Sequence, residues 1–353
     1  MLGIDTRAAR AAWTVFLLAL LIAAAYAIRE TLAVFMSALL FAYLLNPLVG
    51  LVERFTPKQV SPRVALAIVY LVLVGAIVAL AITLGSRIVE EANSLAEKLP
   101  GLMTNRSWID RIPLPQWLEP VRARIVELLQ TQFENGGRGL LPYIGRLGGQ
   151  LVSGAKYILY IVLIPILAFF FLKDGREIRD DVVVSLVNED RRPIVDNILE
   201  DINLLLGEYI RALVLLSLAS FTASSLFLGL SGAPYAVLLA GVAALGEFIP
   251  VVGPAAAAII ILLVTGLSGY THLLLYILFW ILYRLVQDYA LSPYLMGRGI
   301  NLNPMLVLFG VLAGDQIAGV IGMFFSVPVI ATLRVIFVRL RRSRVTELVS
   351  PRV

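Results

Sequence analysis

The chain contains no cysteine and only one histidine, His272. Without cysteine there is no disulfide bond, no thiolate zinc site and no haem attached through a Cys-x-x-Cys-His motif. A single histidine also excludes a histidine-rich metal site. The sequence has neither a phosphate-binding loop of the pattern G-x-x-x-x-G-K-S/T nor an H-E-x-x-H zinc motif. We therefore expect no metal, no bound cofactor and no enzyme activity.

Charge is also scarce. Charged residues make up 15% of the chain and hydrophobic residues 59%, whereas soluble domains carry about 25% charged residues. Several apolar runs reach the roughly 20 residues that a helix needs to cross a bilayer. These features predict an all-α polytopic membrane protein. The net charge of +5 does not indicate nucleic-acid binding, because much of it lies in a cluster after the last apolar run. That cluster is Arg334, Arg339, Arg341, Arg342 and Arg344.

The apolar runs predict about eight membrane segments. Continuous helices are expected at about 11–28, 31–52, 64–86, 152–172, 209–230 and 269–290. Two longer segments, 234–266 and 304–338, contain helix breakers. The expected organisation is N-terminal helices (1–86), an extracytoplasmic helical insert (87–150), one further membrane helix (151–175), cytoplasmic amphipathic helices (176–207), a transport core (208–338) and a basic tail (339–353).

Basic residues in the short loops predict the orientation, because such loops are enriched in Lys and Arg on the cytoplasmic side. Arg7, Arg10, Lys58, Arg63 and Lys173 fall in loops expected on one side of the membrane. We therefore expect both termini to be cytoplasmic, in the inner membrane of a bacterium. The basic tail is expected to bind the membrane surface.

Helix breakers interrupt both long segments. A helix cannot pass Pro250 and Pro254 unbroken, because proline lacks an N–H and clashes with the preceding turn. The breakers and helix-start residues are Gly246, Pro250, Gly253, Pro254, Asn303, Pro304, Gly314, Gly319 and Pro328. Each segment is either a re-entrant hairpin or a span with an unwound centre. If both are hairpins, they enter from opposite sides, as in inverted-repeat transporters.

Each long segment carries one carboxylate near its break, and these are the candidate coupling-ion ligands. Glu247 follows Gly246, and Asp315 with Gln316 follows Gly314. A charged group inside a membrane costs about 2.5–3.5 kcal/mol when unpaired, so it indicates a functional site. The alternative is a hairpin tip that reaches water.

A third polar group lies on the 269–290 helix, where Arg284, Gln287 and Asp288 share one face. They form either a local ion pair at the end of a span or a polar stripe that pairs with Glu247 or Asp315. In the second case, all three belong to the transport path.

Three stretches together resemble the autoinducer-2 exporter family, also called PerM-like permeases. They are Phe170–Gly175, Gly246–Pro254 with its Ile-Pro-x-x-Gly-Pro core, and a block from Gln287 to Pro328 that includes Leu291-Ser292-Pro293, Asn303-Pro304, Gly314 and Gly319. The chain departs from the family pattern at Asp288-Tyr289-Ala290. The resemblance covers nearly the whole chain.

The resemblance implies secondary transport by a homo-oligomer. It favours export of a small polar solute such as the quorum-sensing signal autoinducer-2, with a proton or sodium ion as the coupling ion. A sodium(lithium)/proton antiporter is the second hypothesis. A membrane scaffold or regulator without transport is the third. The expected partners are a small polar solute, the lipid bilayer and further copies of the chain.

Overall fold

The structure, a computed structural model, describes residues 6–53, 62–104, 155–296 and 302–349. Within these ranges all regular structure is helical, which confirms the predicted all-α class. The elements are α1 (Thr6–Ala27), α2 (Arg29–Glu53), α3 (Pro62–Thr104), α7 (Ala155–Leu186), the short 3₁₀ helix η2 (Glu189–Arg191), α8 (Arg192–Leu230), α9 (Ala236–Gly246), α10 (Val252–Leu267), α11 (Leu273–Val286), the π-helix η3 (Gln287–Leu291), α12 (Ser292–Met296) and α13 (Pro304–Val349).

Several helices are long and apolar enough to cross a membrane. Among the described residues, five stretches qualify by length and composition: Arg29–Gly50, Leu66–Lys98, Arg192–Leu230, Leu273–Leu295 and Pro304–Arg341. The last of these is not one straight helix, because its backbone leaves the helical region at Ala318 and Gly319. Large apolar side chains stand on their outer faces, as Leu71 (70% exposed) and Leu218 (57% exposed) do. Lipid is the environment that such faces require. The predicted polytopic membrane protein is therefore confirmed.

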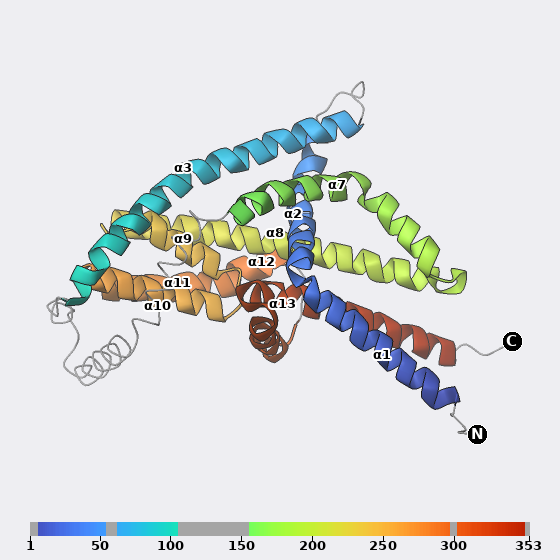
Figure 1. The fold of residues 1–353 in the computed structure, drawn as a ribbon. Helices are drawn as coiled ribbons and strands as arrows, with labels where there is room; N and C mark the ends of the chain where they lie inside the picture. Colours follow the sequence, from blue (N-terminus) through green and yellow to red (C-terminus); the bar gives the residue numbers. More distant parts are fainter. Residues whose placement is uncertain (1–5, 54–61, 105–154, 297–301, 350–353) are drawn as a thin grey trace.

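Helix α8 runs along most of the molecule, and α2, α9, α12 and α13 pack against it (Figure 1). One core cluster, near the C-terminal end of α8, joins Leu228 to Leu239 of α9. A second cluster, near the middle of the helix, joins Ile210 to Leu40 of α2 and Val327 of α13. Because α8 contacts both broken segments, it provides a common reference for their positions.

The first broken segment is a helical hairpin made of α9 and α10. α9 has 11 residues and α10 has 16, so they span about 17 Å and about 24 Å at 1.5 Å per residue. Both are shorter than the roughly 30 Å hydrocarbon core. Pro250 lies in the turn, where Val251 has a φ of 66°. Pro254 lies in the first turn of α10, where the missing N–H removes no hydrogen bond.

The two arms of this hairpin cross at a pair of glycines. A Cβ on Gly253 would overlap the carbonyl oxygen of Gly246, and a Cβ on Gly246 would lie 2.8 Å from the carbonyl oxygen of Gly253. No side chain fits between the backbones at this point. Glycine is therefore required here by close approach of the chain rather than by an unusual φ.

The second broken segment is also a hairpin, formed within α13. The backbone leaves the helical region at Ala318 and Gly319, where Gly319 has a φ of 59° and a ψ of −141°. The arms again cross at glycines, since a Cβ on Gly322 would overlap the carbonyl oxygen of Gly314. Asn303 begins the segment: its Oδ1 accepts a hydrogen bond from the N–H of Met305 at 2.9 Å, as an N-cap residue does.

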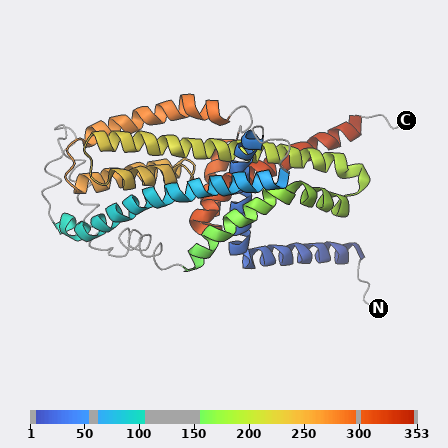
Figure 2. The same ribbon diagram turned by 90° about the horizontal axis from the view of Figure 1, so that it is seen from above.

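The hairpins enter from opposite ends of the bundle. In the first, Ala244 of α9 accepts a hydrogen bond from Ser217 of α8, and the next residues toward the tip reach the core around Ile210. Its tip thus points toward the N-terminal end of α8. In the second, Val327 lies in that same core, and Arg339, farther from the tip, pairs with Asp201. Its tip therefore points the other way. In Figures 1 and 2, α9 and α10 lie beside the C-terminal half of α8, and the C-terminal end of α13 runs along its N-terminal half.

Three helices are longer than the sequence indicates. α3 continues without interruption from the expected membrane span through 87–104, because residues 86–99 contain neither glycine nor proline. The rest of the expected insert, 105–150, lies outside the described residues. α7 and α8 continue through 173–186 and 192–208, and the chain turns between them just before Pro193, at the expected break. The first broken segment, expected from residue 234, begins its first helix at Ala236.

The end of α13 is tied to α8 by charge. Arg339 contacts both carboxylate oxygens of Asp201, Nε to Oδ2 at 2.6 Å and Nη2 to Oδ1 at 2.8 Å. Such a bidentate pair fixes orientation as well as distance. This member of the basic cluster thus holds a neighbouring helix, rather than being free for a membrane surface. Residues 350–353 of the expected basic tail lie outside the described residues.

Candidate functional site

Glu247 lies at the tip of the first hairpin, directly after the crossing glycine Gly246. It is 8% exposed, and nothing else in its hairpin is charged. Removing a carboxylate from water costs several kcal/mol unless donors replace the lost hydration. The surrounding side chains must therefore supply those donors.

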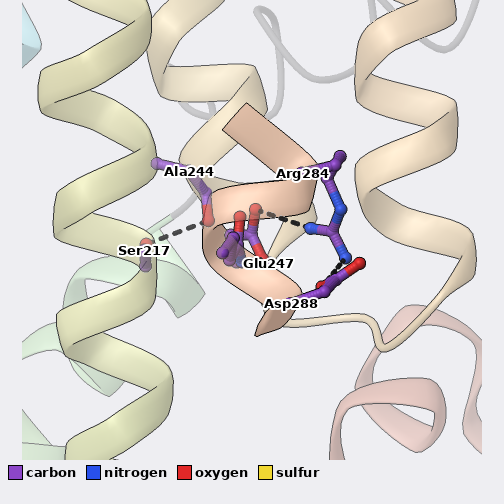
Figure 3. A network of polar contacts seen from close by, with 6 residues as sticks. Ser217, Ala244, Glu247, Arg284 and Asp288 are labelled. Carbon is purple, nitrogen blue, oxygen red and sulfur yellow. Dashed lines mark hydrogen bonds and ion pairs between the residues drawn. The ribbon is translucent and has the colours of Figure 1, made fainter. Parts of the chain in front are cut away.

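Two side chains from the next helix contact Glu247. Gln287 Nε2 donates a hydrogen bond to Glu247 Oε2 at 2.6 Å. Arg284 Nη1 lies 3.5 Å from Glu247 Oε1, and Arg284 Nη2 lies 3.0 Å from Asp288 Oδ1. Figure 3 shows the guanidinium between the two carboxylates. Both sequence hypotheses for Arg284 thus describe the structure: the local pair with Asp288 and the long-range pair with Glu247 exist together.

The local backbone explains how Gln287 reaches the carboxylate. The helix changes from α to π at Gln287, and the π-turn extends to Leu291. A π-turn inserts an extra residue into a helical turn and is frequent at functional sites. Gln287 is 2% exposed, while Asp288 next to it keeps a 53% exposed side chain. One residue of the π-turn is therefore buried against the hairpin, and its neighbour is not.

The hairpin is held at this position from the opposite side by α8. Ser217 Oγ donates a hydrogen bond to the carbonyl oxygen of Ala244 at 2.9 Å (Figure 3). That carbonyl belongs to the last turn of α9 and also accepts the backbone N–H of Glu247 at 3.2 Å. Serine and glutamine thus fix the two sides of the hairpin tip.

A small cavity adjoins Glu247. It has a volume of about 20 Å³ and is lined by Ser220 and Ser224 of α8, by Ala243, Glu247, Pro254, Ala257, Ala258 and Ile261 of the hairpin, and by Tyr276, Phe279, Trp280, Tyr283 and Arg284 of α11. About 10–15 Å³ suffices for one water molecule, whereas pockets for small molecules measure about 300–1,000 Å³. The cavity therefore has room for one water-sized species and none for a metabolite.

Among the described residues, Gln287 Oε1 is a buried polar atom beside the carboxylate that has no hydrogen-bond partner. Unsatisfied buried groups each cost about 1–3 kcal/mol and call for an explanation. Two carboxyl groups, those of Glu247 and Asp288, share the single guanidinium of Arg284.

The second hairpin places Asp315 as the first places Glu247, directly after a crossing glycine. Asp315 and Gln316 are nevertheless exposed, and neither joins the network around Glu247. The hairpins meet through aromatic side chains instead. The ring centroids of Phe248 and Phe324 lie 5.7 Å apart. The structure thus brings together Glu247, Arg284, Gln287 and Asp288, and leaves Asp315 and Gln316 outside that group. Among the described residues no cluster of His, Asp and Glu suitable for a metal ion occurs.

Sequence reasoning did not identify Ser217, Ser220, Ser224 or Tyr283. The first three lie at helical spacing on one face of α8, which is a recognisable pattern. Their partner could not be inferred, because serine in a membrane helix equally well bonds its own preceding turn. The π-turn at Gln287 has no signal in the sequence.

Apolar spanning helices, two opposed re-entrant hairpins and a buried charged cluster at a hairpin tip define a multi-pass membrane transport protein. The chain belongs to the AI-2E transporter family, whose family model, described as "AI-2E family transporter", matches residues 15–342.

Curated relatives of similar length carry related names. The "Putative transport protein YueF" of Bacillus subtilis is 24% identical over 343 residues, which cover 90% of each chain. The "AI-2 transport protein TqsA" of Escherichia coli is 25% identical over 315 residues, 87% of this chain and 85% of that protein. The "Putative transport protein YrrI" of Bacillus subtilis is 28% identical over 197 residues, 55% and 56% of the two chains.

Proposed function

We propose that the protein is a secondary transporter that exports a small polar solute such as autoinducer-2 across a bacterial cytoplasmic membrane. Family membership supports transport, and the similarity to the AI-2 transport protein TqsA of Escherichia coli supports this solute class. The start of α1 and the end of α13 lie at one end of the bundle, together with the acidic end of α7 and the acidic start of α8 (Figure 1). The Lys and Arg residues of the short loops support a cytoplasmic location for that end. The working unit is a homo-oligomer.

One observation carries the proposal: the carboxylate of Glu247 is buried at a re-entrant tip and held by Gln287 and Arg284. A charge placed at such a depth is costly, and it is useful where it binds an ion or a polar solute. The two carboxyl groups of the cluster provide the site for the coupling proton or sodium ion. The polar groups of a solute would compete for Gln287 and Arg284.

The size of the cavity sets a condition on this mechanism. A volume of about 20 Å³ does not admit a metabolite. Export of such a solute therefore requires the first hairpin to move away from α8 and α11. Ser217, Gln287 and Arg284 are the contacts that such a movement would break.

The same cavity favours a second candidate function, sodium(lithium)/proton exchange. A site for one water-sized species beside a carboxylate and two serine hydroxyls fits a monovalent cation without any enlargement. In this mechanism, Glu247 would carry a proton in one half of the cycle and help to bind the metal ion in the other half.

Reconstituted wild-type protein separates the two candidates. Proteoliposomes loaded with labelled autoinducer-2 would lose it faster than empty-vector liposomes if solute export is correct. Proton movement on addition of sodium or lithium, with no effect on autoinducer-2, would support the antiporter. If neither activity is present across a range of pH, both candidates are contradicted and a scaffold or regulator becomes the better explanation.

A further inference from the structure

The start of helix α9 lacks the usual means of satisfying its N–H groups. Tyr235, at the N-cap position, has a left-handed backbone (φ 57°, ψ 37°) and provides no side-chain hydrogen bond, and the first turn contains no acidic residue. Unpaired N–H groups at a helix start need a partner. This need is greatest where lipid replaces water.

The partner comes from a distant helix. Glu91 of α3 accepts a hydrogen bond from the backbone N–H of Leu238 at 2.8 Å, across 147 positions of sequence. A carboxylate at a helix N-terminus replaces a missing cap and also interacts favourably with the helix dipole. The bond involves a charged acceptor, which makes it roughly twice as strong as a neutral one.

The contact continues along one face of α3. Ile88, three residues before Glu91, lies 3.6 Å from the point that a Cβ on Gly241 would occupy. Leu95, four residues after Glu91, is 4% exposed and shares a core cluster with Leu239 of α9. Spacings of three and four place these side chains on one helix face. Glu90 lies outside this face and is exposed.

We infer that Glu91 is a positioning residue of the transport site: it anchors the base of the first hairpin on α3, so that the tip holds Glu247 against Gln287 and Arg284. This inference rests on the proposed role of Glu247. It assigns a function to the C-terminal part of α3, a helix whose 43 residues extend about 65 Å, about twice the thickness of the hydrocarbon core.

The variants Glu91→Ala and Glu91→Gln test the anchor, with Glu90→Ala as the matched control. Alanine removes the acceptor, whereas glutamine keeps an oxygen acceptor without the charge. Hydrogen–deuterium exchange of the full chain in nanodiscs is measured for peptides from α9 and α8. We expect the α9 peptides of Glu91→Ala to exchange about 5-fold faster than those of the wild type. The exchange rate of the α9 peptides in Glu91→Gln should lie between those of Glu91→Ala and the wild type. In Glu90→Ala it should equal the wild-type rate.

Faster exchange in the α9 peptides of Glu91→Ala, without a matching increase in α8, supports the role of Glu91 as an anchor. Two other outcomes would overturn it. Equal exchange of α9 in Glu91→Ala and wild type would show that the contact does not hold the helix. Equally increased exchange in α8 would show a general loss of stability instead of positioning. Transport is then compared in the same variants. A wild-type rate in Glu91→Ala, with α9 loosened, would overturn the link to Glu247. If the wild type itself transports nothing, the proposed function fails, while the exchange result still decides the anchor.

Discussion

Gln287 donates the shortest hydrogen bond of the buried network to Glu247, 2.6 Å from Nε2 to Oε2, from a residue 40 positions away in sequence. The amide belongs to a π-turn and the carboxylate to a re-entrant tip, so neither group is placed by regular helix geometry. A single hydrogen bond thus joins the two irregular backbone features of the site. Loss of this hydrogen bond should lower both the stability of the protein and its rate of transport.

Replacing Gln287 by glutamate should make the stability of the protein depend on pH. Two carboxylates at this distance cannot both be ionised, and they must share a proton. We expect Gln287→Glu to be less stable than the wild type by about 3 kcal/mol near neutral pH, and to recover as the pH is lowered. Gln287→Leu, which adds no charge, should show no such recovery. Thermal unfolding in detergent between pH 5 and 8, followed by tryptophan fluorescence, measures this difference.

The glycine crossings should not tolerate a methyl group. Gly253→Ala forces the arms of the first hairpin apart, and overpacking of this kind costs about 1–3 kcal/mol. Gly322→Ala should do the same in the second hairpin. Gly75→Ala is the control, because no atom lies within 4 Å of the added Cβ and alanine favours a helix by up to about 1 kcal/mol. Melting temperatures should fall for the first two variants only.

Filling the cavity should stop transport without unfolding the protein. Ser224→Val projects a larger apolar group into the space beside Glu247. Ser225→Val is the matched control, since Ser225 is the next residue on α8 and does not line the cavity. We expect at least a 10-fold lower rate for Ser224→Val at nearly unchanged melting temperature, because a water-sized site has no spare volume. Equal rates in the two variants would show that the cavity is not on the path.

The Arg339–Asp201 pair should contribute modestly to stability. Both side chains are more than one-third exposed, so solvent screens the pair and its contribution to stability is small. Arg339→Glu should lower the melting temperature by a few degrees, and the double variant with Asp201→Arg should recover most of that loss. High salt should reduce the difference. A double variant no better than the single one would show that the contact does not stabilise the end of α13.

The hairpins themselves could be anticipated, because proline and glycine act on the local backbone. Pro250 lies in the turn of the first segment and Pro254 in the first turn of its second arm, and the second segment breaks at Ala318 and Gly319. The sequence does not distinguish a hairpin from a broken span. The close contacts between Gly246 and Gly253 and between Gly314 and Gly322 show that both segments are hairpins. These contacts join residues on different arms, and spacing along the chain does not determine them.

The polar partners were harder to predict. Arg284, Gln287 and Asp288 could be grouped because they share a helix face, and Glu247 stood out as a lone carboxylate in an apolar run. The contacts of Glu247 with Arg284 and Gln287 depend on how α11 packs against the hairpin, and this packing is a tertiary property. Asp315 looked equivalent to Glu247 in sequence, yet its hairpin leaves it exposed. The sequence around Glu91 does not indicate its role, because the N–H group that it caps lies 147 positions away along the chain.

The rate of transport by Glu247→Gln in proteoliposomes tests the central claim most directly. Glutamine keeps the size of the side chain and removes its charge, so the hairpin should still fold. Glu189→Gln, on the exposed helix η2, is the charge-matched control. We predict that Glu247→Gln loses nearly all transport of autoinducer-2 or of sodium against protons, with a monodisperse elution profile, while Glu189→Gln retains the wild-type rate. Wild-type transport by Glu247→Gln would contradict the assignment of this carboxylate as the centre of the transport site.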